Sequence, residues 1–469
     1  MTSLHPHPDR LLPADPAVRA VARRLYDEVA SAPILSPHGH VDARMLLDDE
    51  PFDDAANLLV TPDHYVTRLL HAHGVTLDRL GLRRDGGPAD PREVWRTFCA
   101  HWDAFLATPV RFWLETQLHD LFEVDVQPST ETADAIFDQL ADRLARPAYR
   151  PRALFERFGI EVLATTDDPA DDLSAHRALA ADPSFRGRVV PTFRPDRYLD
   201  PAAPGWANGL DRLAASADVD AGTYAGLLDA LRARRAAFAA AGGTATDTGV
   251  PDAGCEPLDA ADAERIHREG LAGTVSAADA VAYRRDLLFR LAEMSADDGL
   301  VMQLHAGVIR NHHRPTLASY GPDTGHDLPD VGGYTRPLRP ILERFGTSET
   351  FRIVLFTTDE SLFSREIGPL AGFYPSVFAG APWWFLDSPA AIARYRAAVT
   401  DSAGVGKTSG FIDDTRAFCS IPARHDMSRR ADAAWLARLV TTHQLSEDEA
   451  AGIARRLVDE IPRSAFRLG

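Results

Sequence analysis

The sequence predicts an α/β fold in which parallel strands close into a barrel, and three observations support this. Short apolar runs of strand length alternate with long Ala/Leu/Arg-rich stretches of helical spacing, the pattern of a parallel sheet with crossover helices. Polar, reactive residues follow almost every run, as in enzymes that build their sites at the C-terminal ends of barrel strands. No G-x-G-x-x-G or G-x-x-x-x-G-K-[ST] motif follows any run, so a doubly wound nucleotide-binding sheet, which the alternation also allows, is less favoured.

Six runs are the candidate strands, because each is rich in Val, Ile, Leu or Phe and is bounded by turn or polar residues. In chain order they are APILSPHGHVD (32–42), IEVLATTDDP (160–169), RVVPTFRPD (188–196), LVMQLHAGVIRN (300–311), FRIVLFTTDE (351–360) and SGFIDDTRAF (409–418). The reactive residues at their C-terminal ends are His38 and His40, Thr165 to Asp168, Arg194 and Asp196, His305 and Arg310, and Asp413 to Arg416.

Two connections between these runs are longer than one crossover helix. Residues at about 45–155 contain several helical patterns and predict a helical insertion over the barrel mouth, after strand 1. Residues at about 200–285 predict an enlarged helical connection, with a Gly/Thr/Asp-rich loop at 242–254. No repeat or low-complexity linker divides the chain, so we expect residues 1–469 to form a single barrel domain.

Composition excludes several classes of partner. The formal net charge of −18 repels nucleic acid and anionic membranes, although a few buried Arg could still bind a small anion. The three Cys are far apart, which predicts neither a disulfide framework nor a Cys-type zinc site and fits a reducing compartment. No apolar leader and no run of about 18 apolar residues occurs. We therefore expect a soluble, cytoplasmic protein.

The pair His38/His40 is the best candidate for metal binding among three His-x-His pairs. Alternate residues of a strand face the same side, so these two side chains would point together into the barrel. His71 and His73, on a predicted helix, would diverge. An ordinary pair with no ligand is the alternative, and a carboxylate from a distant strand would favour the metal site.

Asp413 and Asp414 could supply that carboxylate, because a closed barrel brings its last strand beside its first. Arg416 would lie on the same side as Asp414 and could hold an anion. An aspartate in a turn or at a helix N-terminus is the alternative interpretation.

Nine motifs in the same order give the chain a specific resemblance to a known family. The chain resembles the uronate (glucuronate) isomerases of the amidohydrolase superfamily, which implies a distorted (β/α)8 TIM barrel of the metal-dependent amidohydrolase type. The motifs are HGH (38–40), DHY (63–65), ERFGIEVLATTDDPADDL (156–173), PTFRPD (191–196), QLHAGVIRN (303–311), GPDTG (321–325), WWF (383–385), DTR (414–416) and RHD (424–426).

The resemblance also implies roles for individual residues. His38, His40 and Asp414 would surround a divalent metal, usually zinc. Arg194, Tyr65 and Arg416 match groups that contact the substrate, and His305, Arg310 and Trp383 are further candidates for substrate binding, with core packing as the alternative for Trp383. Family members are often oligomeric, so a homo-oligomer that acts on a small-molecule uronate is expected.

These residue types suit an aldose–ketose isomerisation. The reaction moves a proton between neighbouring carbons through an enediol, so it needs a base and a group that stabilises the developing oxyanion. Asp414 can be the base, the metal or Tyr65 can stabilise the oxyanion, and Arg416 would complete the catalytic group. An Arg is the natural bidentate partner of the uronate carboxylate.

Three departures from the family pattern leave other functions open. Thr248 stands where the family commonly has a His, the motif RHE becomes RHD at Asp426, and Leu386 replaces an Asn. One alternative is another metal-dependent enzyme of the superfamily that acts on a different sugar acid. Another is a non-catalytic sugar-acid-binding paralogue, which could have lost the base and the metal ligands.

Overall fold

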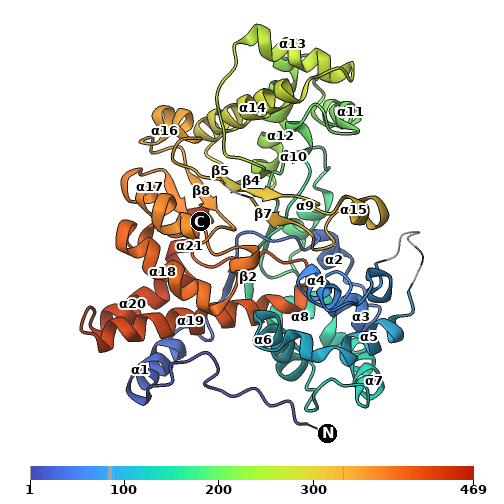
Figure 1. Ribbon diagram of the computed structural model, residues 1–469, viewed down its shortest axis with the longest axis vertical. Coiled ribbons are helices and arrows are strands. Elements are labelled where there is room, and N and C mark those ends of the chain that lie inside the picture. The colour runs from blue at the N-terminus through green and yellow to red at the C-terminus, as the bar shows by residue number, and fades with distance from the viewer. Residues whose placement is uncertain (1, 83–86, 88, 331) are drawn as a thin grey trace.

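A parallel barrel forms the centre of the molecule (Figure 1). The computed structural model describes residues 2–82, 87, 89–330 and 332–469. Within these ranges β1, β2 and β3 pair in parallel in that order, and β4, β5, β8 and β9 form a second parallel sheet in that order. Their bounds are β1 Ile34–Ser36, β2 Ile160–Ala164, β3 Arg188–Val190, β4 Ala245–Val250, β5 Val301–Ala306, β8 Ile353–Phe356 and β9 Val377–Ala379.

Backbone hydrogen bonds join the two sheets at both edges. At one edge, Phe193 follows β3 and pairs with β4: its N–H donates to the Ala245 carbonyl at 3.2 Å, and its own carbonyl accepts from Asp247 at 2.9 Å. At the other edge, a segment over residues 408–415 lies between β9 and β1. The Ser409 N–H donates to the Ala379 carbonyl at 2.9 Å, which fixes the start of this segment.

The last contact closes the barrel beside the HGH motif. The Asp414 N–H donates to the His38 carbonyl at 3.3 Å, and the His40 N–H donates to the Thr415 carbonyl at 3.0 Å. The first and last parallel segments are therefore neighbours, as the barrel hypothesis requires.

Two barrel strands were not predicted from the sequence. The stretch 242–254, expected to be a loop within the connection at 200–285, contains β4. Its Gly, Thr and Asp content is typical of loops, but Thr246, Asp247 and Thr248 are all buried between neighbouring strands that satisfy their backbone groups. The other strand, β9, has only three residues. The predicted strand at 409–418 forms no regular strand: its backbone is left-handed at Gly410 and Asp414, and a 3-10 turn begins at Phe418.

The long connection between β1 and β2 is helical. In Figure 1 these helices gather at the lower right of the barrel, in blue and cyan. Several begin at an aspartate whose side chain accepts a backbone N–H, as at Asp42, Asp54, Asp63 and Asp90. Residues 83–86 and 88 of the predicted insertion lie outside the described residues. The helices are α2 Ala43–Asp48, α3 Ala55–Leu59, α4 His64–Ala72, α5 Pro91–Ala100, α6 Pro109–Thr116, α7 Ala133–Leu144 and α8 Pro151–Arg157.

Helices also surround the other half of the barrel, and their large apolar side chains fill the core between helices and strands. They are α9 Ser174–Ala181, α10 Asp196–Leu199, α11 Trp206–Ala217, α12 Tyr224–Ala240, α13 Ala260–Leu271, α14 Ala277–Asp298, α16 Arg339–Phe345, α17 Gly368–Phe373, α18 Pro389–Ala403, α19 Ile421–Thr441, α20 Glu447–Val458 and α21 Glu460–Phe466. In the described ranges, no helix is both long and apolar enough to cross a membrane.

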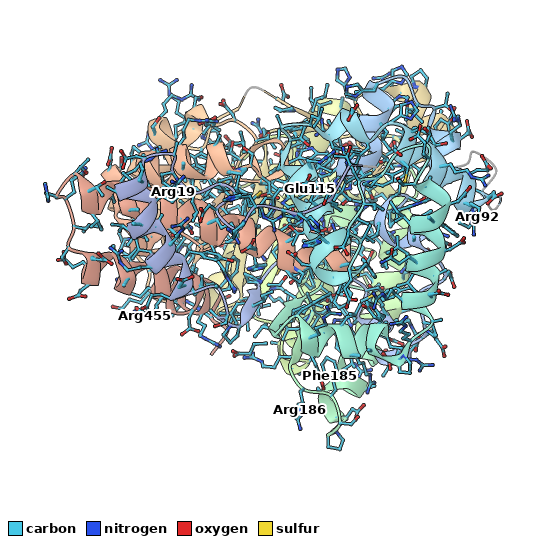
Figure 2. The ribbon with its side chains drawn as sticks, turned by 90° about the horizontal axis from the view of Figure 1, so that it is seen from below. Arg19, Arg92, Glu115, Phe185, Arg186 and Arg455 are labelled. Atoms are coloured by element: carbon cyan, nitrogen blue, oxygen red, sulfur yellow. The ribbon has the colours of Figure 1, made fainter. Side chains whose placement is uncertain are left out.

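The N-terminal helix α1, Pro16–Asp27, packs against α19 and α20 in a separate apolar cluster. Figure 2 shows this end of the molecule from below, with Arg19 and Arg455 at one side and Arg92 of the insertion at the other. The division into a single domain stays a prediction.

A short antiparallel hairpin interrupts the connection after β5. It consists of β6, Val308–Ile309, and β7, Leu328–Pro329, with α15, Arg314–Tyr320, between them. The hairpin brings residues 310–327 to the C-terminal ends of the strands, where the candidate site lies.

Candidate active site

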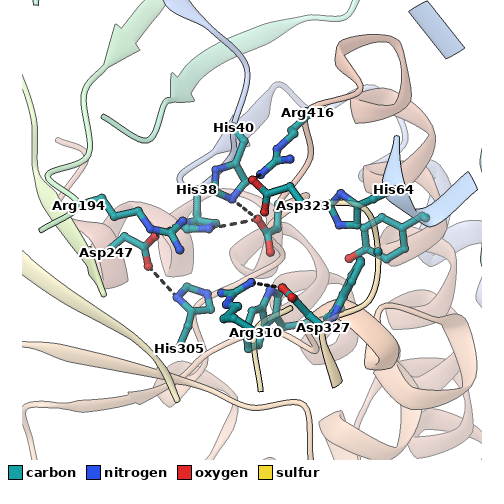
Figure 3. Close-up of a pocket in the computed structure, with 15 residues that line it drawn as sticks. His38, His40, His64, Arg194, Asp247, His305, Arg310, Asp323, Asp327 and Arg416 are labelled. Carbon is teal, nitrogen blue, oxygen red and sulfur yellow. Dashed lines mark hydrogen bonds and ion pairs between the residues drawn. The ribbon is translucent and has the colours of Figure 1, made fainter. Parts of the chain in front are cut away.

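A cavity of about 140 Å³ lies at the C-terminal ends of the barrel strands (Figure 3). Strands β4 and β5 and the segments that follow β1, β3, β6 and β9 contribute to its walls. The start of α4, the loop before β7 and the segment that closes the barrel, residues 408–416, complete them. The lining residues are His38, His40, His64, Tyr65, Arg194, Asp247, His305, Arg310, Asp323, Gly325, Asp327, Trp383, Trp384, Asp414 and Arg416.

Two imidazoles face one carboxylate oxygen in this cavity. The Nε2 atoms of His38 and His40 lie 3.2 Å and 2.9 Å from Oδ1 of Asp414. Ligands about 2.0–2.1 Å from a tetrahedral ion are about 3.3 Å apart, so both separations suit a shared cation. Two imidazoles with one carboxylate also form a donor set typical of catalytic zinc. The three side chains therefore fit a divalent metal.

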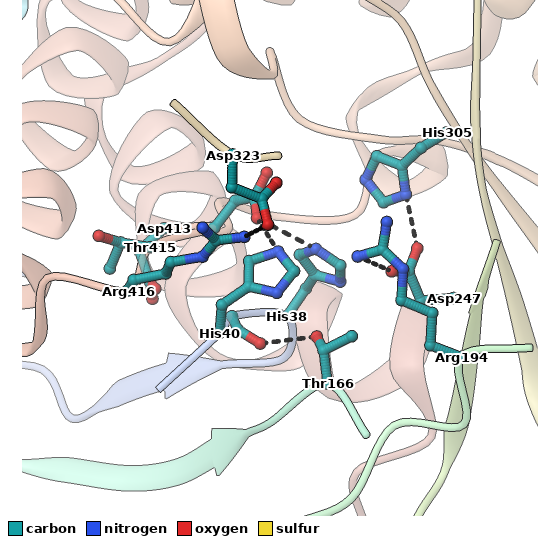
Figure 4. A network of polar contacts seen from close by, with 12 residues as sticks. His38, His40, Thr166, Arg194, Asp247, His305, Asp323, Asp413, Thr415 and Arg416 are labelled. Atoms are coloured by element: carbon teal, nitrogen blue, oxygen red, sulfur yellow. Dashed lines mark hydrogen bonds and ion pairs between the residues drawn. The ribbon is translucent and has the colours of Figure 1, made fainter. Parts of the chain in front are cut away.

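The closing contacts of the barrel hold these three side chains together (Figure 4). His38 and Asp414 belong to backbone segments that pair directly, and Thr166 Oγ1 donates to the Gly39 carbonyl at 2.8 Å from the neighbouring strand end. Asp414 has a left-handed backbone with φ of 41°. Non-glycine residues are rare in this conformation, and such strain is concentrated at functional sites.

The charges of this cluster depend on one another. Burial alone would raise the pKa of Asp414, but the facing imidazoles of His38 and His40 lower it well below its ordinary value. Burial lowers the pKa of His40. For His38 the same effect of burial is outweighed by Asp414 and Asp247, so its pKa is raised. Asp414 is therefore ionised at neutral pH.

A second polar cluster lies on the other side of His38. Asp247 Oδ1 is 2.7 Å from His305 Nδ1, and Asp247 Oδ2 is 3.2 Å from Arg194 Nη1. Arg194 Nε also donates to Asp196 at 2.8 Å. Burial would raise the pKa of Asp247, but Arg194, His305 and His38 lower it. Arg194 is thus held rigidly by two carboxylates.

Two further Arg side chains enter the cavity in ion pairs with the hairpin region. Arg310 Nη1 is 2.7 Å from Asp327, and Arg416 Nη2 is 3.1 Å from Asp323. Burial would raise the pKa of Asp323, but Arg416 lowers it. The Asp323 side chain is 51% exposed, so an incoming anion could replace it as the partner of Arg416.

Aromatic rings form the opposite wall. Trp384 packs against Tyr65 and His64, with ring centroids at 4.7 and 4.3 Å, and Trp383 packs against His305 at 4.6 Å. Both Trp side chains are buried and also line the cavity. The pair therefore contributes to the core and to the wall of the pocket. Burial raises the pKa of Tyr65 well above its ordinary value, which keeps the phenol protonated.

The structure brings the predicted site residues into one cavity, although their roles remain predictions. The nine residues to which the resemblance assigned roles all line it: His38, His40, Tyr65, Arg194, His305, Arg310, Trp383, Asp414 and Arg416. Asp413, Asp196 and the residues from Thr165 to Asp168, also singled out in the sequence, are not among the lining residues. Asp63 instead caps α4, where it accepts the Tyr65 N–H at 2.9 Å. Thr248, Leu386 and Asp426, the three departures from the family pattern, are not among the lining residues.

Several lining residues were missed. Asp247 lies in the TDTG stretch that was expected to be a loop. A signal was present, because Asp247 directly precedes Thr248, the position where the family commonly has a His. His64 was not missed outright: in the DHY motif beside Tyr65, a helix N-terminus and a direct contact were both open for it. Asp323 stands within GPDTG but was not singled out. Asp327 had no local signal, because its importance comes from a partner 17 residues away.

Comparison with known proteins identifies close relatives over the whole length. The family model for glucuronate isomerase matches residues 17–463. A uronate isomerase of Rhizorhabdus wittichii is 51% identical, with 98% of each chain covered, and one of Corynebacterium efficiens is 50% identical, with all of each chain covered. The crystal structure of a glucuronate isomerase from Caulobacter crescentus has a TM-score of 0.97 at 43% identity, covering 100% of this chain and 98% of that one.

The structural likeness also tests the predicted fold class. The predicted fold class, a distorted (β/α)8 barrel with a helical insertion after strand 1, is confirmed. A putative metal-dependent hydrolase from Lactobacillus casei shares the fold at a TM-score of 0.53 and 14% identity.

Proposed function

Because the chain belongs to the glucuronate isomerase family, we propose that it isomerises D-glucuronate to D-fructuronate, D-galacturonate to D-tagaturonate, or both. One observation carries this proposal: a carboxylate facing two imidazoles shares a cavity with three Arg side chains. The carboxylate with its two imidazoles suits proton transfer beside a cation, and the three Arg side chains suit the binding of an anionic sugar.

His38, His40 and Asp414 are the proposed metal ligands, with zinc as the expected ion. When bound there, the ion would act as a Lewis acid beside the carbonyl oxygen that gains negative charge during the reaction. Asp414 directs Oδ1 toward the two imidazoles. A carboxylate has a second oxygen, which can accept a proton.

Asp414 is the proposed base. It takes the proton from the carbinol carbon next to the aldehyde and returns it to the aldehyde carbon. The hydroxyl proton of the carbinol passes to the former aldehyde oxygen, so the aldose becomes a ketose with no net change in protons. A base must be ionised before it acts, and the lowered pKa of Asp414 meets this condition. The transfer between neighbouring carbons needs no redox cofactor.

Tyr65 is the proposed donor to the oxyanion. Its phenol stays protonated because burial raises its pKa, so it can donate a hydrogen bond where negative charge develops. The rings of Trp384 and Trp113 pack edge-on against Tyr65, at 4.7 and 5.4 Å between centroids. Such packing fixes the ring orientation before substrate arrives.

Arg194, Arg310 and Arg416 are the proposed cationic contacts of the substrate, with His305 and Trp383 beside them. Arg416 also belongs to the proposed catalytic group, because it follows Asp414 by two residues in the closing segment. The carboxylate of the uronate would take the place of Asp323 on Arg416, or would bind the free face of Arg194. Arginine is suited to either contact because its planar guanidinium holds a carboxylate in a bidentate manner.

Proton NMR in deuterated water tests the proposal directly. The zinc-supplemented protein is mixed with D-glucuronate and, separately, with D-galacturonate, and the Asp414→Asn variant serves as the control. We expect signals of the matching ketouronate with the wild-type protein only. Silence with both sugars at full metal occupancy would contradict the proposal and favour another sugar acid or a non-catalytic paralogue.

Three further proposals concern the state of the protein. We propose a cytoplasmic location, because all three Cys are buried and unpaired, as is usual in a reducing compartment. We also propose a homo-oligomer, which light scattering after gel filtration would detect. The chain is proposed to form a single barrel domain over residues 1–469, so it should unfold in one calorimetric transition.

A further inference from the structure

A second group of potential metal ligands lies away from the barrel cavity, where the N-terminal segment meets the helical insertion. His5, His119 and Asp125, here called the N-terminal triad, have ligand atoms that all lie within 4.8 Å of one another. His5 belongs to the segment before α1, His119 to the π-helical turn Gln117–Leu121 after α6, and Asp125 to the loop that follows. Figure 2 labels Glu115 on α6, the helix that leads into this turn.

The spacing of the triad suits a cation. His119 Nδ1 lies 3.4 Å from Asp125 Oδ1. Two ligand atoms of one tetrahedral zinc ion are expected to lie about 3.3 Å apart. The rings of His5 and His119 meet edge-on at 5.4 Å between centroids. The His5 side chain is exposed, so its rotamer can adjust toward the other two ligand atoms when an ion binds.

His119 Nδ1 faces the Asp125 carboxylate without a hydrogen bond to it. This atom is buried and makes no hydrogen bond within the described part of the chain. A buried polar atom left unpaired destabilises the fold, so such atoms call for a partner. A cation held between His119 and Asp125 would supply that partner.

The backbone holds His5 at the site. The Leu4 N–H donates to the Asp125 carbonyl at 2.8 Å, and the Gln127 N–H donates to the Thr2 carbonyl at 2.9 Å. Ser3 and Val126 form an antiparallel bridge between the same two stretches. Leu4 is buried in the core next to this pairing. His5 and Asp125 are therefore neighbours because of the fold, not through a chance approach of two mobile side chains.

Charge does not oppose a cation here. Two Arg side chains near this turn have partners of their own. Arg10 is paired with Asp120 at 3.4 Å and with Asp426 at 3.9 Å, and Arg157 Nη2 donates to the Asp120 and Leu121 carbonyls at 3.4 Å. The formal net charge of the chain is −18. Long-range electrostatics therefore favour the approach of a divalent ion.

We propose that the N-terminal triad binds one Zn²⁺ ion, separate from the ion of the barrel cavity, and that this ion clamps the N-terminal segment onto the insertion. With two imidazoles and one carboxylate, the triad has the same donor types as the cavity group. A water molecule would complete the tetrahedron at this exposed position.

Zinc counting tests the proposal. Full-length protein is stripped with a chelator, supplied with zinc in steps and desalted, and bound zinc per chain is measured by plasma mass spectrometry. The variants are His119→Gln and His5→Gln. The control is His7→Gln, because His7 is an exposed histidine of the same segment whose Nδ1 accepts the Asp9 N–H at 3.0 Å.

We expect wild-type and His7→Gln proteins to bind one ion more per chain than either triad variant. Equal stoichiometry in wild-type and His119→Gln proteins, or an equal loss in His7→Gln, would overturn the proposal. His5 is exposed, so its variant tests the site even if His119→Gln disturbs the turn.

Hydrogen exchange gives a second readout that does not depend on activity. With free zinc at about ten times the dissociation constant, exchange of the Leu4 and Gln127 amides should slow about tenfold in the wild-type protein, because the ion must leave before the clamp opens. His119→Gln should show no such slowing. Unchanged exchange in the zinc-loaded wild-type protein would refute the clamp.

Discussion

Asp414 carries two of the proposed tasks, ligand and base, and its surroundings explain how. One oxygen faces two imidazoles at 2.9 and 3.2 Å, and the left-handed backbone at this position turns the side chain toward the first strand. An amide at this position would keep the shape of the carboxylate but would lose the charge and the basic oxygen.

We predict that Asp414→Asn lowers kcat by about 10²- to 10⁴-fold, the range that a general base supplies. The NMR assay measures the rate, and circular dichroism should show an unchanged fold. Asp426→Asn is the control, because Asp426 accepts hydrogen bonds from Tyr26 and Arg430 outside the cavity. Near-normal turnover by Asp414→Asn would refute the assignment of the base.

Arg194 is predicted to act mainly through substrate binding. Replacing it by Met removes a charged contact to the sugar acid worth about 1.5–3 kcal/mol, so KM should rise by about 10- to 100-fold. Arg197→Met is the control, because Arg197 is half-exposed and pairs with Asp168. An unchanged KM for Arg194→Met would move the carboxylate contact to Arg310 or Arg416.

At the scale of single elements, α9 shows how a buried histidine links pH to stability. His176 on this helix contacts β2 through Thr165 Oγ1, which lies 2.8 Å from its Nε2. Burial lowers the pKa of His176 to about 4. In the unfolded chain this imidazole is protonated below about pH 6.5, whereas in the folded chain it stays neutral down to about pH 4. The free energy of unfolding therefore falls as the pH drops from about 6.5 to about 4.

The expected loss due to His176 is about 2–3 kcal/mol between pH 7 and pH 4.5. Urea unfolding at both pH values measures it. His176→Gln should lose less stability than the wild-type protein over this interval, whereas His73→Gln, at an exposed histidine, should behave as wild type. Equal losses in all three proteins would show that His176 is not the sensor.

Helix α19 supports the cavity from behind through Arg424. The guanidinium of Arg424 is fully buried, donates to Asp387 at 3.1 Å, lies 3.8 Å from Asp63 and stacks 4.6 Å from the Tyr65 ring. It thus connects the start of α4 with the segment after β9. Arg424 is a positioning residue for Tyr65 and does not line the cavity itself.

Arg424→Met should lower the free energy of unfolding by about 3–5 kcal/mol, because the change leaves two buried carboxylates without their cation. Chemical denaturation measures this effect. Arg438→Met is the matched control on the exposed face of the same helix. If the two variants had similar free energies of unfolding, the ion pairs of Arg424 with Asp387 and Asp63 would contribute little to stability.

Strands were predictable where composition and burial agreed. Strands β2 and β5 both contain Val and Leu, with Ile in β2 and Met in β5, and their burial is complete or nearly complete. Strand β4 could not be recognised by composition, because its sequence ATDTGV is polar and its strand geometry comes from the strands on either side. Tertiary context, rather than local propensity, decides such a strand. Asp247 was missed for the same reason.

For the whole molecule, the important feature is where the barrel closes. His38 and His40 belong to the first strand region and Asp414 to the last, so the proposed metal would join the two ends of the barrel as well as serve the reaction. The sequence allowed this junction to be expected, because a closed barrel brings its first and last strands together. The resemblance of the HGH and DTR motifs to the family implied that the three residues share an ion. The ion pairs of Arg310 and Arg416 with the hairpin region depend on long-range packing, so they could not be predicted.

A metal that joins the ends of the barrel should stabilise the native state, because the unfolded chain does not hold its ligands together. At a free zinc concentration about 1,000 times the dissociation constant, the gain is about 4 kcal/mol, which corresponds to about 4 °C in Tm for a chain of this length. Chelation should therefore lower Tm by about this amount and abolish turnover, and zinc should restore both. The measurement is made by calorimetry in the His119→Gln background, so that the proposed N-terminal ion does not contribute. The same variant with Asp414→Asn added should show no response to the chelator. If the double variant lost as much Tm as the single one, the stabilising ion would not be at the junction of the barrel.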